Sequence, residues 1–245
     1  MSVSAPSGRI WKHDVAAAAR PLAAAVTAGF IAGLAIGGVG GRLAMFVLRL
    51  TSDPALRGLK TDDDFTIGIF SGATLFLVFL TAIAGAVGGL VYLAVRAWLP
   101  ERARPWLFAT LTGVVGGALV IRPDGIDFTL LEPLWLAVVM FVALPASYGV
   151  AVSLLAERFL ASHSAFTGPW AWVAGLVLLL PLGLFGPAGV AVLAVIVAAL
   201  FLSRSAPQMG WLWTSGPFAW IGRAVLAAVA VVGAASLVRD VTEIL

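Results

Sequence analysis

Residues 65 to 95 form a run of 31 residues without a charged side chain. A helix of about 20 such residues spans the hydrocarbon core of a bilayer, because a helix makes its backbone hydrogen bonds internally. The whole chain has the same bias, with 61% hydrophobic and 11% charged residues, against about 25% charged in a soluble domain. The sequence therefore predicts an all-α integral membrane protein in contact with the lipid bilayer. The net charge of +3 gives no indication of nucleic-acid binding.

Proline, glycine and charged residues divide the chain into seven apolar segments. We predict a basic cytoplasmic segment over residues 1–20, followed by one transmembrane domain over 21–245. A bundle of seven helices is expected, or six if the fifth and sixth segments form one broken span; a hairpin of two short spans is favoured. The segments are 21–48, 66–95, 106–121, 133–156, 169–183, 187–202 and 217–238.

Basic residues indicate the orientation, because loops rich in Lys and Arg stay in the cytoplasm. With the N-terminus inside, nine basic residues lie on the inner side and five on the outer side. The predicted location is a bacterial cytoplasmic membrane with the C-terminus outside. The inner residues are Arg9, Lys12, Arg20, Arg96, Arg102, Arg104, Arg158, Arg204 and Arg223, and the outer ones are Arg49, Arg57, Lys60, Arg122 and Arg239.

Acidic residues gather in two predicted outer loops, and each loop contains the tripeptide Asp-Phe-Thr. The first loop carries Asp62, Asp63 and Asp64, and the second carries Asp124 and Asp127. Acids before a helix cap its first turn and favour the positive end of its dipole, which is one explanation. Capping uses one or two acids per helix, however, and it leaves part of the cluster unexplained.

Two further explanations of these acids stay open. Arg42 and Arg49 lie seven residues apart on one helix face, where they are expected either to reach the headgroups or to pair with the acids. Alternatively the carboxylates bind a cation, and an oxygen-only ligand set favours calcium or magnesium. The metal ligands would then come from Asp62, Asp64 and Asp127. No other cofactor is expected, since the chain has no cysteine and only two histidines.

Small residues recur every fourth position in the first segment and predict a smooth ridge along one helix face. The ridge is expected either to pack within the bundle, against Gly88, Gly89, Gly113 or Gly117, or to bind a membrane-protein partner or a second copy. The two acidic loops also suggest a parallel repeat of helical hairpins, residues 21–98 and 106–160, followed by the hairpin 169–203 and the last helix 217–238. The ridge consists of Ala25, Gly29, Gly33, Gly37 and Gly41.

The sequence contains no recognisable catalytic arrangement. The histidines, His13 and His163, are predicted in cytoplasmic segments, and the spans contain no pair of acids. The primary hypothesis is a non-catalytic membrane component whose outer acidic loops bind a cation or a basic partner. A channel or transporter for a small solute is the first alternative, and an interfacial lipid-modifying enzyme is the second.

Overall fold

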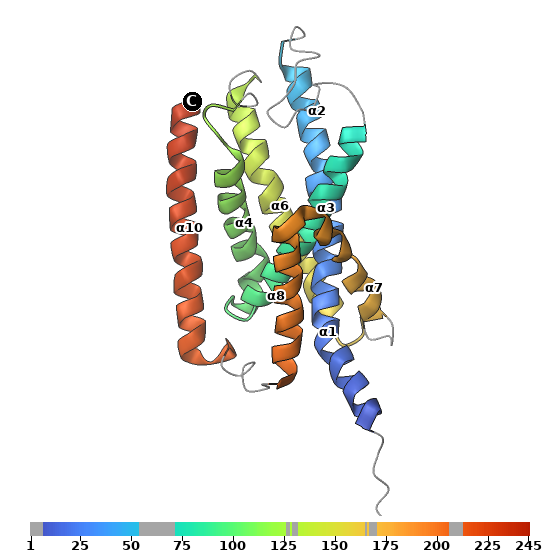
Figure 1. Cartoon of the computed structure of the whole chain (residues 1–245). Helices are drawn as coiled ribbons and strands as arrows, with labels where there is room; N and C mark the ends of the chain where they lie inside the picture. Colours follow the sequence, from blue (N-terminus) through green and yellow to red (C-terminus); the bar gives the residue numbers. More distant parts are fainter. Residues whose placement is uncertain are drawn as a thin grey trace, which may run out of the picture.

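The computed structural model of the chain describes residues 7–53, 72–125, 128, 132–164, 166, 171–205 and 213–245, and these residues fold as a bundle of helices (Figure 1). Among these residues, five helices are long and apolar enough to cross a membrane. The all-helical class and the apolar helices expected of a membrane protein are therefore confirmed. The five candidate spans are Ala19–Thr51, Thr74–Val95, Glu101–Val120, Leu134–Leu160 and Gly216–Ile244.

The first span belongs to one continuous helical rod with a π-helical section in its middle. It consists of α1 (Ser7–Ala32), the π-helix η1 (Gly33–Gly40) and α2 (Gly41–Thr51). A π-helix is wider than an α-helix and such sections are rare. Here it coincides with the glycine-rich stretch, where the rod passes between the helices of the second and fourth spans.

The remaining spans alternate in direction along the bundle (Figure 1). They are α3 (Gly72–Val95), α4 (Arg104–Val120), α6 (Leu134–Leu160) and α10 (Gly216–Ile244). A proline in the first turn begins both α4 and α10, as is common because a first-turn residue needs no amide hydrogen. We call the end of the bundle where α1 begins the N-terminal end and the opposite end, where the chain finishes, the far end.

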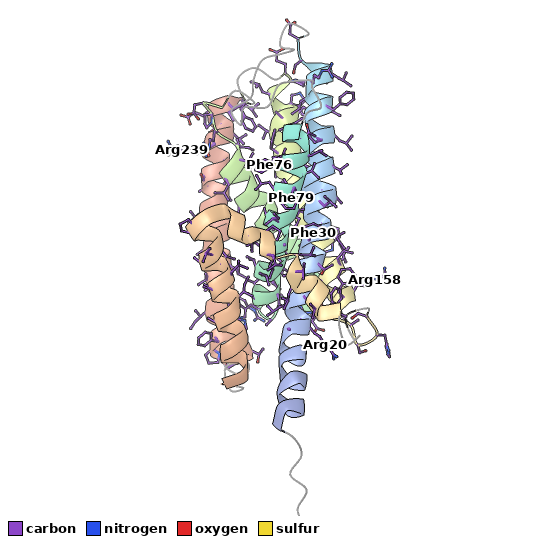
Figure 2. The ribbon with its side chains drawn as sticks, turned by 45° about the vertical axis from the view of Figure 1, so that its right-hand side comes forward. Arg20, Phe30, Phe76, Phe79, Arg158 and Arg239 are labelled. Atoms are coloured by element: carbon purple, nitrogen blue, oxygen red, sulfur yellow. The ribbon has the colours of Figure 1, made fainter. Side chains whose placement is uncertain are left out.

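Packing places α1 against α3 and α6, and α4 between α6 and α10. Tyr92, Phe108 and Val152 are buried together and join α3, α4 and α6. The outward faces carry large apolar side chains, and Figure 2 shows two of them, Phe76 and Phe79, on α3. In water such exposure would be unfavourable, whereas in a bilayer it provides the lipid contact.

The two short spans expected between residues 169 and 203 are not confirmed, and neither is the count of seven. This region forms α7 (Ala171–Val177), the 3-10 helix η5 (Leu180–Phe185) and α8 (Gly186–Ser205). A helix of seven residues is about 10 Å long, too short to cross about 30 Å. The chain turns back instead within the bundle, and both ends of this hairpin point toward the N-terminal end (Figure 1).

The packing agrees with the predicted repeat of helical hairpins in one respect, because α1 packs against α3 as α4 packs against α6, and differs from it in another. If α4 and α6 repeated α1 and α3 about a two-fold axis, α4 would pack against α3 in the same way as α1 packs against α6. α1 does pack against α6, but the main neighbours of α4 are α6 and α10. The repeat of helical hairpins therefore stays a prediction.

Candidate functional site

At the far end, the roots of the two acidic loops are fastened to each other. Ser52 ends α2, and its hydroxyl lies 2.7 Å from the carbonyl oxygen of Leu48 and 3.1 Å from that of Glu132. The backbone amide of Glu132 also donates to the Ser52 hydroxyl, at 2.9 Å. The first loop leaves the bundle at Ser52 and the second returns to it at Glu132, so one polar contact joins the two loops where they meet the bundle.

A buried apolar cluster supports this junction. Leu48 of α2, Ile121 at the end of α4, and Phe128 of the second loop are packed with Ala137 of α6. The Phe128 ring meets that of Phe141 edge to face, with 5.2 Å between centroids. Phe128, the aromatic residue of the second Asp-Phe-Thr, is thus an anchor that holds the loop against the bundle.

The acidic residues themselves are only partly within the described chain. Asp53 and Asp124 are exposed at the far end, and Asp124 lies in a turn closed by the amide of Gly125 and the carbonyl of Arg122. The remaining predicted ligands, Asp62, Asp63, Asp64 and Asp127, lie outside the described residues. Within the part of the chain that is described, no three His, Cys, Asp or Glu side chains gather as a metal site would require.

The two arginines predicted near these acids lie on α2. A guanidinium nitrogen of Arg42 contacts the Met45 sulfur at 3.8 Å. The Arg49 guanidinium stacks 6.0 Å from the ring centre of Phe46, a distance at which a cation is attracted by the ring face. The Arg49 Nε is buried and makes no hydrogen bond within the described residues. The contact of Arg42 or Arg49 with the acidic run of the first loop therefore stays a prediction.

The glycine ridge lies against α3 of the same chain. A Cβ atom added at Gly29 would overlap the Gly85 carbonyl oxygen, and one added at Gly33 would overlap that of Thr81. Gly37 faces the Thr81 side chain, while Gly41 has open space around it. Ala25 is fully buried, and its carbonyl lies where a Cβ of Gly89 would be. Backbones approach this closely only where side chains are absent.

Among the glycines expected to face the ridge, Gly89 does so and three do not. Gly88 faces the hydroxyl of Tyr148 on α6, which donates to the carbonyl oxygen of Gly85 at 2.7 Å. Gly113 and Gly117 lie against Ala146 and Val142, also of α6. Two glycine seams therefore exist, α1 with α3 and α4 with α6.

The N-terminal end carries a charged cluster that the sequence analysis did not identify. Glu157 of α6 receives two hydrogen bonds from Arg96, of 2.9 and 2.8 Å, and one of 2.7 Å from the Tyr92 hydroxyl. Arg104 of α4 reaches the same carboxylate at 3.4 Å and also donates to the Arg96 carbonyl at 3.1 Å. The hydrogen bonds to Glu157 raise the pKa of Arg96 above its usual range.

We call Tyr92, Arg96, Arg104 and Glu157 the Glu157 cluster. It joins the ends of α3 and α6 to the start of α4, with the carboxylate of Glu157 as the common acceptor. Every partner is more than 50 residues from Glu157 in sequence, so spacing alone gives no signal. The arrangement is that of a structural lock between helices, because a carboxylate that accepts four hydrogen bonds has little capacity left for a ligand.

Comparison with protein-family models, with curated proteins and with solved structures finds no match to this chain.

Proposed function

We propose that this chain is a non-catalytic component of a membrane, whose acidic loops at the far end bind a cation or a basic partner. The single observation that supports it best is the hydrogen-bonded junction of Ser52 with Glu132. The roots of both loops meet there, which supports the proposal that the acids of the two loops serve one site.

The distribution of charge along the bundle agrees with this proposal. At the N-terminal end, the acid inside a helix, Glu157, is neutralised by Arg96 and Arg104. Figure 2 shows further arginines, Arg20 and Arg158, at that end, and Arg239 toward the other. If the proposed binding loops bring their carboxylates together, these groups would repel one another unless a cation or a basic surface neutralised them, and this repulsion would drive binding.

An enzymatic function receives less support. His163 is exposed just after α6, at the N-terminal end, and His13 belongs to the first turns of α1 at that same end. The roots of the acidic loops, at Ser52 and Glu132, lie at the opposite end, which disfavours a reaction that pairs their carboxylates with a histidine.

The test replaces Asp62, Asp63 and Asp64 by Asn in the full chain, reconstituted in nanodiscs. Calcium and magnesium are titrated while thermal unfolding is followed. A cation at a hundred times its dissociation constant stabilises the native state by about 2.7 kcal/mol, so we expect the wild type to unfold at a higher temperature with the cation and the triple variant to lose this shift.

The matched control replaces Asp240 and Glu243, acids at the end of α10 and outside the two loops, by Asn and Gln. This variant should keep the shift. The alternative ligand is tested by capture of basic membrane proteins from solubilised membranes, with the same three chains. The proposal fails if the triple variant matches the wild type in stability, in response to both cations and in captured partners.

A second candidate, the passage of a small solute, is favoured by Pro145 inside α6, because a proline removes a backbone hydrogen bond and can open a polar pocket beside Tyr148. The Tyr148 hydroxyl is already engaged by Gly85, so a path along it would need helix movement. Uptake of uncharged sugars and amino acids by proteoliposomes tests this function. Uptake no faster than in protein-free vesicles would remove it.

A further inference from the structure

The loop between α3 and α4 is held to the start of α10 by two stacked tryptophans. Trp98 of this loop and Trp213, just before α10, lie with 4.6 Å between their ring centroids. The Trp98 indole donates to the Trp213 carbonyl at 3.3 Å, and the Trp213 indole donates to the Ala94 carbonyl at 2.9 Å. Gly222 of α10 is buried against the Trp98 ring, which a Cβ atom at this glycine would overlap. These contacts fix the beginning of α10 against the loop.

The same contacts position the guanidinium of Arg223, the residue that follows Gly222. Its Nε donates to the Trp98 carbonyl at 2.8 Å, and its Cζ lies 5.6 Å from the ring centre of Trp220, where a cation is attracted by the ring face. Within the described residues Arg223 forms no ion pair, and its terminal amino groups make no hydrogen bond. A planar guanidinium held in this way can still donate two parallel hydrogen bonds to an anion. Arg223 is exposed, so an anion can reach it.

The loop beside Arg223 has an excess of positive charge. Four arginines and two glutamates belong to the loop or contact it, which leaves a formal charge of +2. Glu157 is already bound by Arg96 and Arg104, and Glu101 lies 3.5 Å from Arg104. A ligand with a negative charge is therefore complementary to this surface. The charged residues are Arg96, Glu101, Arg102, Arg104, Glu157 and Arg223.

The surroundings of Arg223 are those of a membrane interface. The residue lies near the beginning of the candidate span Gly216–Ile244, at the N-terminal end of the bundle (Figure 1). Tryptophans collect at the headgroup level of a bilayer, and Trp106 and Trp220 at this end are both largely exposed. Ile221, next to Trp220, is an exposed apolar residue. A ligand that fits this surface combines an anionic head with an apolar chain, whereas an acidic protein segment would leave the apolar side chains without a contact.

We propose that Arg223, framed by Trp98 and Trp220, binds the phosphate of an anionic phospholipid. The terminal amino groups of Arg223 donate to the phosphate oxygens, and Trp220 and Ile221 contact the apolar part of the lipid. In the predicted orientation this end faces the cytoplasmic leaflet, whose surface is negatively charged. The site is independent of the cation site proposed for the acidic loops, because the roots of those loops lie at the far end.

Native mass spectrometry of the full chain in mild detergent tests the site, with phosphatidylglycerol as the probe and zwitterionic phosphatidylcholine as the reference. Phosphatidylglycerol should bind more tightly. Arg223→Gln should weaken its binding about fivefold, which corresponds to about 1 kcal/mol for a basic residue at a membrane surface. Arg239→Gln, near the other end of the same helix, is the matched control and should bind like the wild type. Equal affinity for the two lipids, no loss in Arg223→Gln, or an equal loss in Arg239→Gln would overturn the proposal.

A second variant distinguishes a site of defined geometry from a general attraction of lipid to positive charge. Trp220→Leu keeps the charge of Arg223 and removes the ring beside it, and the parent side chain is 68% exposed, so the packing should be kept. Binding of phosphatidylglycerol should weaken about two- to fivefold, which corresponds to about 0.5–1 kcal/mol for an exposed cation–π contact. Trp135→Leu, at the start of α6 and 57% exposed, is the control and should change nothing.

Wild-type binding in Trp220→Leu would show that charge alone attracts the lipid, and the proposed site would be wrong. If Arg223→Gln fails to fold, Trp220→Leu still decides. Excess inorganic phosphate should leave phosphatidylglycerol bound, because a free anion makes no contact with the apolar side chains. Displacement of the lipid by inorganic phosphate would identify a free anion as the ligand and would contradict a lipid site.

Discussion

In the Glu157 cluster, hydrogen bonds from three side chains converge on one carboxylate at the N-terminal end of the bundle. Glu157 and Arg96 are 34% and 29% exposed, so water screens their attraction in part. The two hydrogen bonds of the Arg96 fork fix the geometry, and the Tyr92 hydroxyl supplies a third bond from the buried side. The contribution of the cluster to stability therefore comes mainly from directed hydrogen bonds.

Replacing Glu157 by Gln should lower the free energy of unfolding by about 1.5–3 kcal/mol, the usual worth of hydrogen bonds to a charged group. The change removes the negative charge and leaves two guanidinium groups close together. Thermal unfolding in nanodiscs measures the loss. Glu101→Gln is the control, because the Glu101 side chain is 85% exposed and its distance to Arg104 is 3.5 Å. If both variants unfold at the wild-type temperature, Glu157 does not lock the helices.

At the scale of single residues, the sequence indicates which side of the membrane a charged residue lies on better than it indicates which residue it contacts. Arg96, Arg104 and Glu157 are assigned to one side of the membrane by the alternation of apolar segments, but their pairing depends on how α3, α4 and α6 pack. The acidic run Asp62 to Asp64 was conspicuous in sequence, whereas a lone Glu followed by an Arg was not. A useful signal in retrospect is that Glu157 is the one acid of α6, a mostly apolar helix in which an ionised group needs a partner.

At the scale of helices, the four-residue spacing of small residues specifies a smooth face, and that face lies on α3. The spacing could not indicate which helix would cover it. Gly88 and Gly89 are adjacent, so they point in different directions, and one meets the ridge while the other meets Tyr148. Gly113 and Gly117 form a face of the same kind as the ridge, but on α4, where α6 covers it.

Gly29→Ala should lower the free energy of unfolding by about 1–3 kcal/mol, the usual cost of overpacking a filled interior. The new methyl group would overlap the Gly85 carbonyl, and backbone must move to admit it. Gly41→Ala is a matched control on the same ridge, because no atom lies within 4 Å of its added Cβ. Since alanine favours a helix over glycine by up to about 1 kcal/mol, this control should be neutral or slightly stabilised. Equal unfolding temperatures in the two variants would contradict the seam.

For the whole molecule, the apolar segments predict a membrane bundle because bilayer thickness fixes the length of a span. The segment between residues 169 and 203 is apolar enough to cross but has its turn at mid-depth, and composition is the same for a crossing and a returning hairpin. What decides is the packing of Leu179 and Leu182 against the middle of α3. An odd number of spans follows in either case, which agrees with α1 beginning at one end of the bundle and α10 finishing at the other (Figure 1).

Single cysteines distinguish a hairpin that returns from one that crosses. With the N-terminus inside, Asp124→Cys should react with an impermeant maleimide on intact cells, and His163→Cys should react after permeabilisation; both parent residues are exposed. Gly183→Cys lies at the tip, where a Cβ meets no other atom, so the substitution fits. Because the tip stays at mid-depth in a returning hairpin, this thiol should react in neither condition, only after denaturation. Reaction on intact cells, as for Asp124→Cys, would mean that the hairpin crosses and that seven spans are present.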